Sequence, residues 1–93
     1  MRDDRFEWDD RKAARNLVRH KVSFEGARRV FDDRSAFEDV DDDPDEERWL
    51  KVGMARDVLL AVVYTDRNGR IRIISARKAD SDEQDRYATQ SVQ

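Results

Sequence analysis

The only histidine of the chain lies on the same predicted helix face as a lysine and an asparagine. Lys12, Asn16 and His20 are spaced at i, i+4 and i+8, which stacks side chains along one face of a helix. Together they would offer a cation, an amide and an imidazole to a phosphodiester, and an imidazole titrates near neutral pH, as proton transfer requires. A solvated polar face, with His20 at the negative end of the helix dipole, explains the same spacing.

A second group of basic residues extends from Arg67 to Lys78 without a single acid. Within it, Asn68-Gly69 predicts a tight hairpin turn, which places Arg67, Arg70 and Arg72 on one face near the turn. Like charges this close must be exposed to solvent or meet an anion. The anion would be an RNA phosphate or an acid of a partner protein, and plain exposure is the alternative.

Arg77 is a separate case within the same strand. The hairpin register pairs it with Leu60 and predicts that it lies on the apolar face with Leu60 and Val62. A guanidinium beside apolar side chains needs an anionic partner or a position near the edge of the sheet. One interpretation is a structural ion pair with Glu83 or Glu7, and the other is an anion clamp at the mouth of a groove.

The composition excludes several other chemistries. The 93 residues contain no cysteine and one histidine, so disulfides and cysteine nucleophiles are excluded, and neither a metal site nor another cofactor is predicted. The sequence has no P-loop and no G-x-S-x-G motif. The net charge of −3 argues against a regulator that binds DNA by itself. With no long apolar run and no signal segment, we expect a cytoplasmic protein without membrane association.

The elements that must position these residues follow from hydrophobic periodicity and capping signals. Asp9 or Asp10 predicts the start of a helix that ends near His20, and Ser23 predicts the start of a second helix. The acidic run at 38–47 is predicted to be a loop. Strands are predicted over 5–8, 48–54, 58–66 and 70–76. A last helix is predicted from 80 or 81 through 87, because Asp80 and Glu83 have the spacing of a capping box. The order β-α-α-β-β-β-α gives a single α+β domain over 1–93, with a small antiparallel sheet, two N-terminal helices and a C-terminal helix.

Several of these segments, in this order, resemble the BrnT family of toxins. The matching stretches are FEWDDRKAARNLVRHKVSFEGARRVFDD, EERWLKVG, LLAVVYTDR and IRIISARKA, followed by Glu83 and Tyr87, so the resemblance covers nearly the whole chain. It implies a RelE-like fold and a ribonuclease that arrests growth by cleaving RNA. It also implies neutralisation by a BrnA-like antitoxin protein, with promoter DNA contacted only through the antitoxin complex.

The resemblance leads to a hypothesis for the site, a metal-independent endoribonuclease in which the 2′-OH of RNA is the nucleophile. Arg77 would stabilise the developing phosphorane charge, Lys12 and His20 would transfer protons or contact phosphate, and Tyr64 would stack a base or assist. The RNA itself would be held by Arg67, Arg70, Arg72, Lys78 and Tyr87. The alternative is a non-catalytic interaction protein whose basic hairpin binds an acidic partner segment.

Two positions depart from the family pattern. The chain has Lys21 where the family commonly has a glycine just past a helix end, and Gly26 where it commonly has a glutamate. The glutamate would complete a capping box with Ser23. Its absence, together with a glycine in the first helical turn, should lower the free energy of unfolding by about 1 kcal/mol. Both departures concern helix ends, so we expect their effect on local helix geometry.

Overall fold

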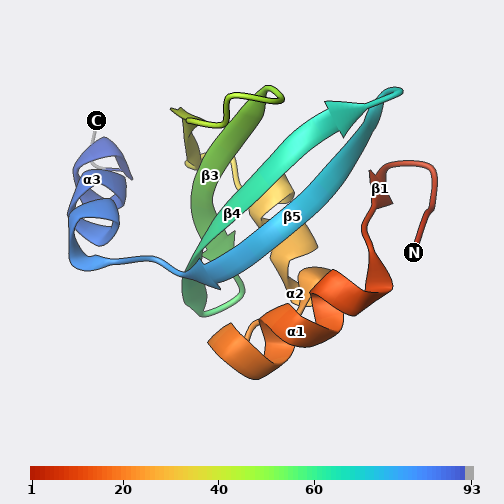
Figure 1. Cartoon of the computed structure of the whole chain (residues 1–93). Helices are drawn as coiled ribbons and strands as arrows, with labels where there is room; N and C mark the ends of the chain where they lie inside the picture. The colour runs from red at the N-terminus through yellow and green to blue at the C-terminus, as the bar shows by residue number, and fades with distance from the viewer. Residues whose placement is uncertain (92–93) are drawn as a thin grey trace.

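The computed structural model describes residues 1–91 and shows one five-stranded sheet with helices packed against it (Figure 1). In chain order the elements are β1 (Phe6–Glu7), α1 (Asp10–His20), α2 (Phe24–Ala27), the 3-10 helix η1 (Arg28–Asp32), β2 (Phe37–Asp41), β3 (Arg48–Ala55), β4 (Val58–Arg67), β5 (Arg70–Lys78) and α3 (Ser81–Ser91). The α+β class is therefore confirmed. Within residues 1–91 no helix is long and apolar enough to cross a membrane.

The strand order is β1-β5-β4-β3-β2, and it corrects two predictions. The sheet is not purely antiparallel, because β1 pairs in parallel with β5 at its edge. The predicted element order is also wrong, because β2 occupies the first part of the acidic run that was predicted to be a loop. At the edge of a sheet β2 buries only Phe37 and keeps Glu38 and Asp39 exposed, so an edge strand accommodates acids that a central strand could not.

The caps of the N-terminal helices lie where the sequence predicts them. The Asp9 carboxylate accepts hydrogen bonds from the backbone N–H groups of α1, and the Ser23 hydroxyl accepts one from the N–H of Gly26. Lys21 ends α1 with φ of 60°, in the left-handed region that a glycine adopts at lower cost. The second helix is a single turn, α2, which η1 continues, and their apolar side chains face the core.

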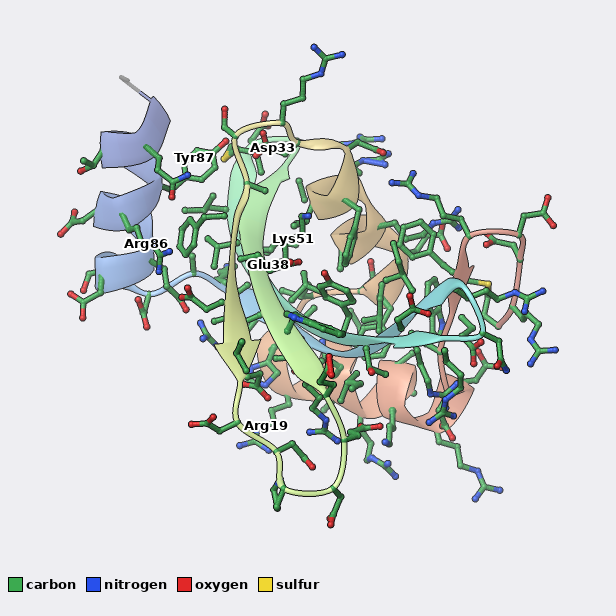
Figure 2. The ribbon with its side chains drawn as sticks, turned by 90° about the horizontal axis from the view of Figure 1, so that it is seen from above. Arg19, Asp33, Glu38, Lys51, Arg86 and Tyr87 are labelled. Atoms are coloured by element: carbon green, nitrogen blue, oxygen red, sulfur yellow. The ribbon has the colours of Figure 1, made fainter. Side chains whose placement is uncertain are left out.

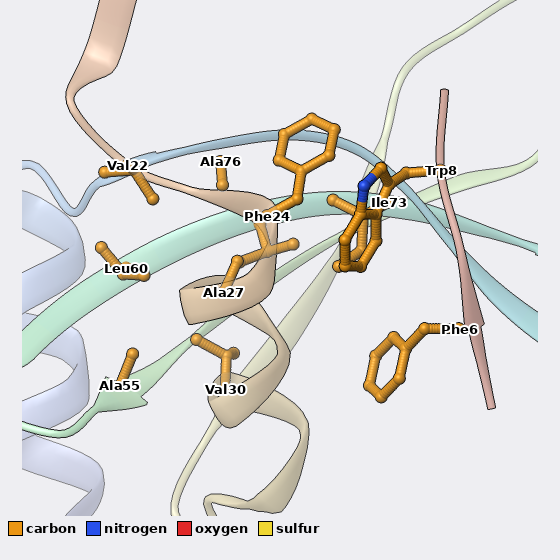
Figure 3. Packing of buried hydrophobic residues seen from close by; sticks show 11 residues of the cluster. Phe6, Trp8, Val22, Phe24, Ala27, Val30, Ala55, Leu60, Ile73 and Ala76 are labelled. Carbon is orange, nitrogen blue, oxygen red and sulfur yellow. The ribbon is translucent and has the colours of Figure 1, made fainter. Parts of the chain in front are cut away.

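The main core lies between these helices and one face of β4 and β5 (Figure 3). Its most buried large side chains include Phe6, Phe24, Val62 and Ile73, and the rings of Phe24 and Trp8 meet edge to face at 5.9 Å. We call this side of the sheet the core face. The opposite side carries a smaller cluster of buried residues, and because Tyr87 of α3 packs against it we call it the α3 face: Phe37, Val52, Ala61 and Ala79.

A β-bulge in β5 changes which side chains of the hairpin share a face. From the turn to the Tyr64–Ile73 pair the register is as predicted, but beyond it Val63 pairs with Ser75, which leaves Ile74 as the extra residue. The predicted pairing of Leu60 with Arg77 is therefore wrong. Leu60 pairs with Lys78, Arg77 pairs with Ala61, and Arg77 lies on the α3 face rather than on the core face.

Polar contacts attach α3 to the rest of the protein. Its first turn has the predicted capping box, in which Asp80 and Glu83 each accept a hydrogen bond from the other's backbone N–H at 2.9 Å or less. Arg86 forms an ion pair with Asp39 at 2.7 Å. The Tyr87 hydroxyl donates to Asp33 at 2.6 Å, and the two side chains lie close together (Figure 2). The helix continues beyond Tyr87 to Ser91, and residues 92–93 lie outside the described part of the chain.

The α3 contacts predict a loss of stability in acid. Burial of the Asp33 carboxyl raises its pKa, but hydrogen bonds from the Met54 N–H and the Tyr87 hydroxyl outweigh burial, and the pKa lies below the ordinary 3.8. A carboxyl with a lowered folded pKa stabilises the fold above its ordinary pKa, and that contribution is lost as pH falls through the folded pKa. Tyr87→Phe should therefore lower the free energy of unfolding by about 1.5 kcal/mol near pH 7 and by less near pH 2.

Denaturant unfolding at several pH values measures this difference. The matched control is Asp42→Asn, an exposed carboxyl without a hydrogen bond among the described residues, which should follow the wild-type pH profile. If the difference in the free energy of unfolding between wild type and Tyr87→Phe stays constant through the acid range, the role given to Asp33 is contradicted.

Candidate functional site

A groove with a volume of about 610 Å³ lies between α1 and β5. The helix contributes Lys12, Arg15, Arg19 and His20 to its lining, and the strand contributes Ile74 and Ser75. No acidic residue of the described chain lines it. The groove therefore combines the only imidazole of the protein with cationic side chains and no opposing charge.

Asn16 fixes α1 against β5 at this groove. Its side chain is buried, and its amide donates to the backbone carbonyls of Ala76 at 2.8 Å and Val22 at 2.9 Å. Its carbonyl oxygen accepts the N–H of Ala76 at 3.1 Å. Asn16 thus provides hydrogen-bond partners for the backbone of β5 beyond the two residues that pair with β1. It also sets the position of the helix that carries Lys12 and His20.

Two of the groove cations, Arg15 and Arg19, were missed by the sequence analysis. The signal that could have found them is the i, i+4 repeat of arginines at 11, 15 and 19 on α1. None of the four basic side chains that line the groove forms an ion pair with a residue that the structure describes. Arg19 is labelled in Figure 2.

Arg77 is not among the residues that line the groove, and its side chain is held by α3. It is two residues from Ser75 on β5, so both side chains project from the same side of the strand. Its two Nη atoms contact both carboxylate oxygens of Glu83 at 2.8 and 3.0 Å, which confirms that Arg77 forms an ion pair with Glu83. This contact raises the pKa of Arg77 and lowers the pKa of Glu83. Its Nε–H has no hydrogen-bond partner within residues 1–91.

The three arginines near the hairpin turn have three different environments. Arg72 forms an ion pair with the buried Glu7 at 2.6 Å. Arg70 donates from Nε to the backbone carbonyl of Asp3 at 2.9 Å. Only Arg67 is exposed and makes no ion pair or hydrogen bond within the described chain. Exposure therefore explains one of the three, and the other two hold the N-terminal segment against the sheet.

The remaining predicted site residues lie away from the groove. Tyr64 is on the core face, with its ring 4.9 Å from that of Phe31 and its hydroxyl donating to Glu38. Burial, together with this hydrogen bond, raises the pKa of Tyr64. Tyr87 is bound to Asp33, as described above. Lys78 lines a different cavity, so the structure does not bring all the predicted residues to one place.

Lys51 lies next to the contact between Tyr64 and Glu38, and it was not singled out by the sequence analysis. Its Nζ is 3.9 Å from the Glu38 carboxylate and 5.5 Å from the centre of the Phe31 ring (Figure 2). The alternation of residues 48–54 places Lys51 and Trp49 on one face, but Glu38 belongs to a strand that the sequence did not predict.

No group of three or more potential metal ligands occurs among residues 1–91.

A small α+β fold with an acid-free basic groove has the features of a protein that binds a polyanion. The family model described as the ribonuclease toxin BrnT of type II toxin–antitoxin systems matches residues 8–83. The chain therefore belongs to the BrnT toxin family, whose members are ribonucleases and act with an antitoxin partner. No curated protein matches the sequence.

Proposed function

We propose that the chain cleaves RNA in the groove between α1 and β5 by attack of a 2′-OH on the adjacent phosphate. A base removes the 2′-OH proton, the new P–O bond forms as the bond to O5′ breaks, and an acid protonates the leaving O5′. The products are a 2′,3′-cyclic phosphate and a free 5′-hydroxyl. RNA supplies the nucleophile itself, so the protein has to provide proton transfer and charge stabilisation only.

The residues at the groove have chemistry suited to these roles. His20 and Lys12 line the groove and are assigned to proton transfer and phosphate contact. The open Nε–H of Arg77 would donate to the phosphorane oxygens while Glu83 holds the guanidinium in place. Tyr64 does not line the groove and contacts Glu38 and Phe31 instead, so its geometry favours a structural role.

One observation carries the proposal: the sole histidine of the chain lines an acid-free groove among cations that form no ion pair with a described carboxylate. A site of this kind attracts and holds a phosphodiester next to a group that can transfer a proton near neutral pH. Family membership supports further parts of the proposal. These are a single toxin domain over 1–93, a RelE-like fold, a BrnA-like antitoxin, and promoter contact only through the antitoxin complex.

The test is cleavage of RNA by the purified chain in the presence of EDTA. We expect wild type to cleave, and His20→Ala and Lys12→Ala each to lower kcat/KM by about 10²-fold. Arg34→Ala is the matched control, because Arg34 is exposed and outside the groove, and it should cleave like wild type.

Two outcomes would contradict the proposal. An intact RNA substrate with tight antitoxin binding would support the non-catalytic interaction protein instead. Full activity of both His20→Ala and Lys12→Ala would show that the reaction takes place outside this groove.

A further inference from the structure

We propose that bound RNA continues from the groove around the C-terminal end of α1 into a second basic cavity. This inference rests on the proposed function. The second cavity has a volume of about 360 Å³ and a partly apolar lining that includes Val22, Ala55, Val58 and Leu60. Its basic side chains are Lys21, Arg29, Arg56 and Lys78.

The linings of the two cavities include consecutive residues at the end of α1. His20 lines the groove and the next residue, Lys21, lines the second cavity. The Asn16 amide, which bonds to the carbonyls of Val22 and Ala76, fixes the backbone between them. We call the basic side chains of the two cavities together the basic track: Lys12, Arg15, Arg19, His20, Lys21, Arg29, Arg56 and Lys78.

Seven of the twelve arginines and lysines that form no ion pair with an acidic side chain of the described residues lie on this track. Within residues 1–91, the arginines and lysines that form an ion pair with an acidic side chain all lie outside both cavities: Arg5, Arg28, Arg48, Lys51, Arg72, Arg77 and Arg86. The one acid in the second cavity, Glu25, is paired with Arg28. In a chain with 22 acidic residues and a net charge of −3, the basic side chains of both cavities thus form no ion pair among the described residues.

The basic lining of both cavities favours RNA over an acidic protein segment as the occupant. RNA carries a negative charge at every nucleotide, so it matches a continuous basic surface whatever its sequence. A protein segment would need acids at matching positions on both sides of the helix end. The second cavity would therefore hold the phosphates that flank the cleavage site, which affects KM more than kcat.

The test uses a 2′-O-methyl RNA, which lacks the nucleophile and is bound without being cleaved. Affinity is measured by fluorescence anisotropy over a range of KCl concentrations, for oligonucleotides of about 4 and about 10 nucleotides. The variant is Lys21→Gln/Arg29→Gln/Arg56→Gln. The matched control is Arg2→Gln/Arg34→Gln, because these two exposed arginines also form no ion pair among the described residues and lie outside both cavities.

We expect the track variant to bind the longer RNA at least about 10-fold more weakly, with a salt slope shallower by about 2, since each lost contact removes about 0.7 from that slope. The short RNA fits the groove alone and should bind as it does to wild type. The control variant should bind both RNAs like wild type, and thermal unfolding verifies that both variants are folded.

Wild-type affinity of the track variant for the longer RNA, or an equal loss for both lengths, would overturn the inference. So would a loss of antitoxin binding with RNA binding intact, which would make the second cavity a protein-docking surface. The proposed function is judged separately, by cleavage of unmodified RNA. If wild type cleaves RNA and the track variant binds the longer RNA as tightly as wild type does, only the track is overturned. If binding depends on RNA length but wild type does not cleave RNA, only the mechanism is overturned.

Discussion

Arg77→Ala is expected to lower kcat/KM for RNA cleavage by about 10²- to 10³-fold, as removal of one donor to a developing oxyanion does in other enzymes. Glu83→Gln is expected to retain activity within about 3-fold, because it keeps the guanidinium whose Nε–H faces no described acceptor. Both substitutions remove the same ion pair between β5 and α3. Their comparison therefore separates the charge of Arg77 from its structural contact.

Initial rates at several RNA concentrations give kcat and KM for each variant, at a temperature where thermal unfolding shows both to be folded. Arg77→Lys provides an intermediate, since an ammonium keeps the charge but not the planar donor geometry. If Glu83→Gln loses as much activity as Arg77→Ala, the role of Arg77 is to position α3, and phosphate is stabilised by other cations.

Arg72→Ala is expected to have the largest effect on stability, about 3 kcal/mol, because it leaves a buried carboxylate without its charge partner. The Glu7 side chain is 6% exposed, its Oε2 contacts Arg72, and its Oε1 has no hydrogen-bond partner among the described groups. For a domain of this size the loss corresponds to a fall in Tm of roughly 12–24 °C.

Arg67→Ala is the matched control, since Arg67 lies on the same hairpin but is exposed and unpaired in the described chain. It should change the free energy of unfolding by no more than about 0.5 kcal/mol. Adding Glu7→Gln to Arg72→Ala should recover part of the loss, because the remaining buried group is then uncharged. Equal stability of the two arginine variants, measured by denaturant unfolding, would show that Glu7 is solvated in solution.

Local signals in the sequence predicted most of the elements correctly. The Asn68-Gly69 turn, the caps at Asp9 and Ser23, and the Asp80–Glu83 capping box depend on a few neighbouring residues, and all of them are present in the structure. The strand β2 was missed because an edge strand has little hydrophobic signal. The acids of β2 are exposed, and Phe37 is the one buried apolar residue that could have indicated a strand in the sheet.

The site was harder to predict because it depends on contacts between distant segments. Lys12 and His20 were found from helical spacing, and both line the groove. The separation of Arg77 from Tyr64 could not be read from the sequence, since the bulge at Ile74 exists only in the pairing of two strands. The partners of Arg72 and Arg77 were among the acids considered, but only the fold assigns Glu7 to one and Glu83 to the other.

The same bulge has a consequence for how sequences of this family are compared. One extra residue in β5 decides which of two consecutive cations, Arg77 or Lys78, lies on the side of the groove. A relative with one residue fewer in this strand would present the neighbouring position there, although its aligned letters would look the same. Counting residues from the turn is therefore a poor guide to equivalent positions in β5, whereas the contact of Asn16 with Ala76 marks the register directly.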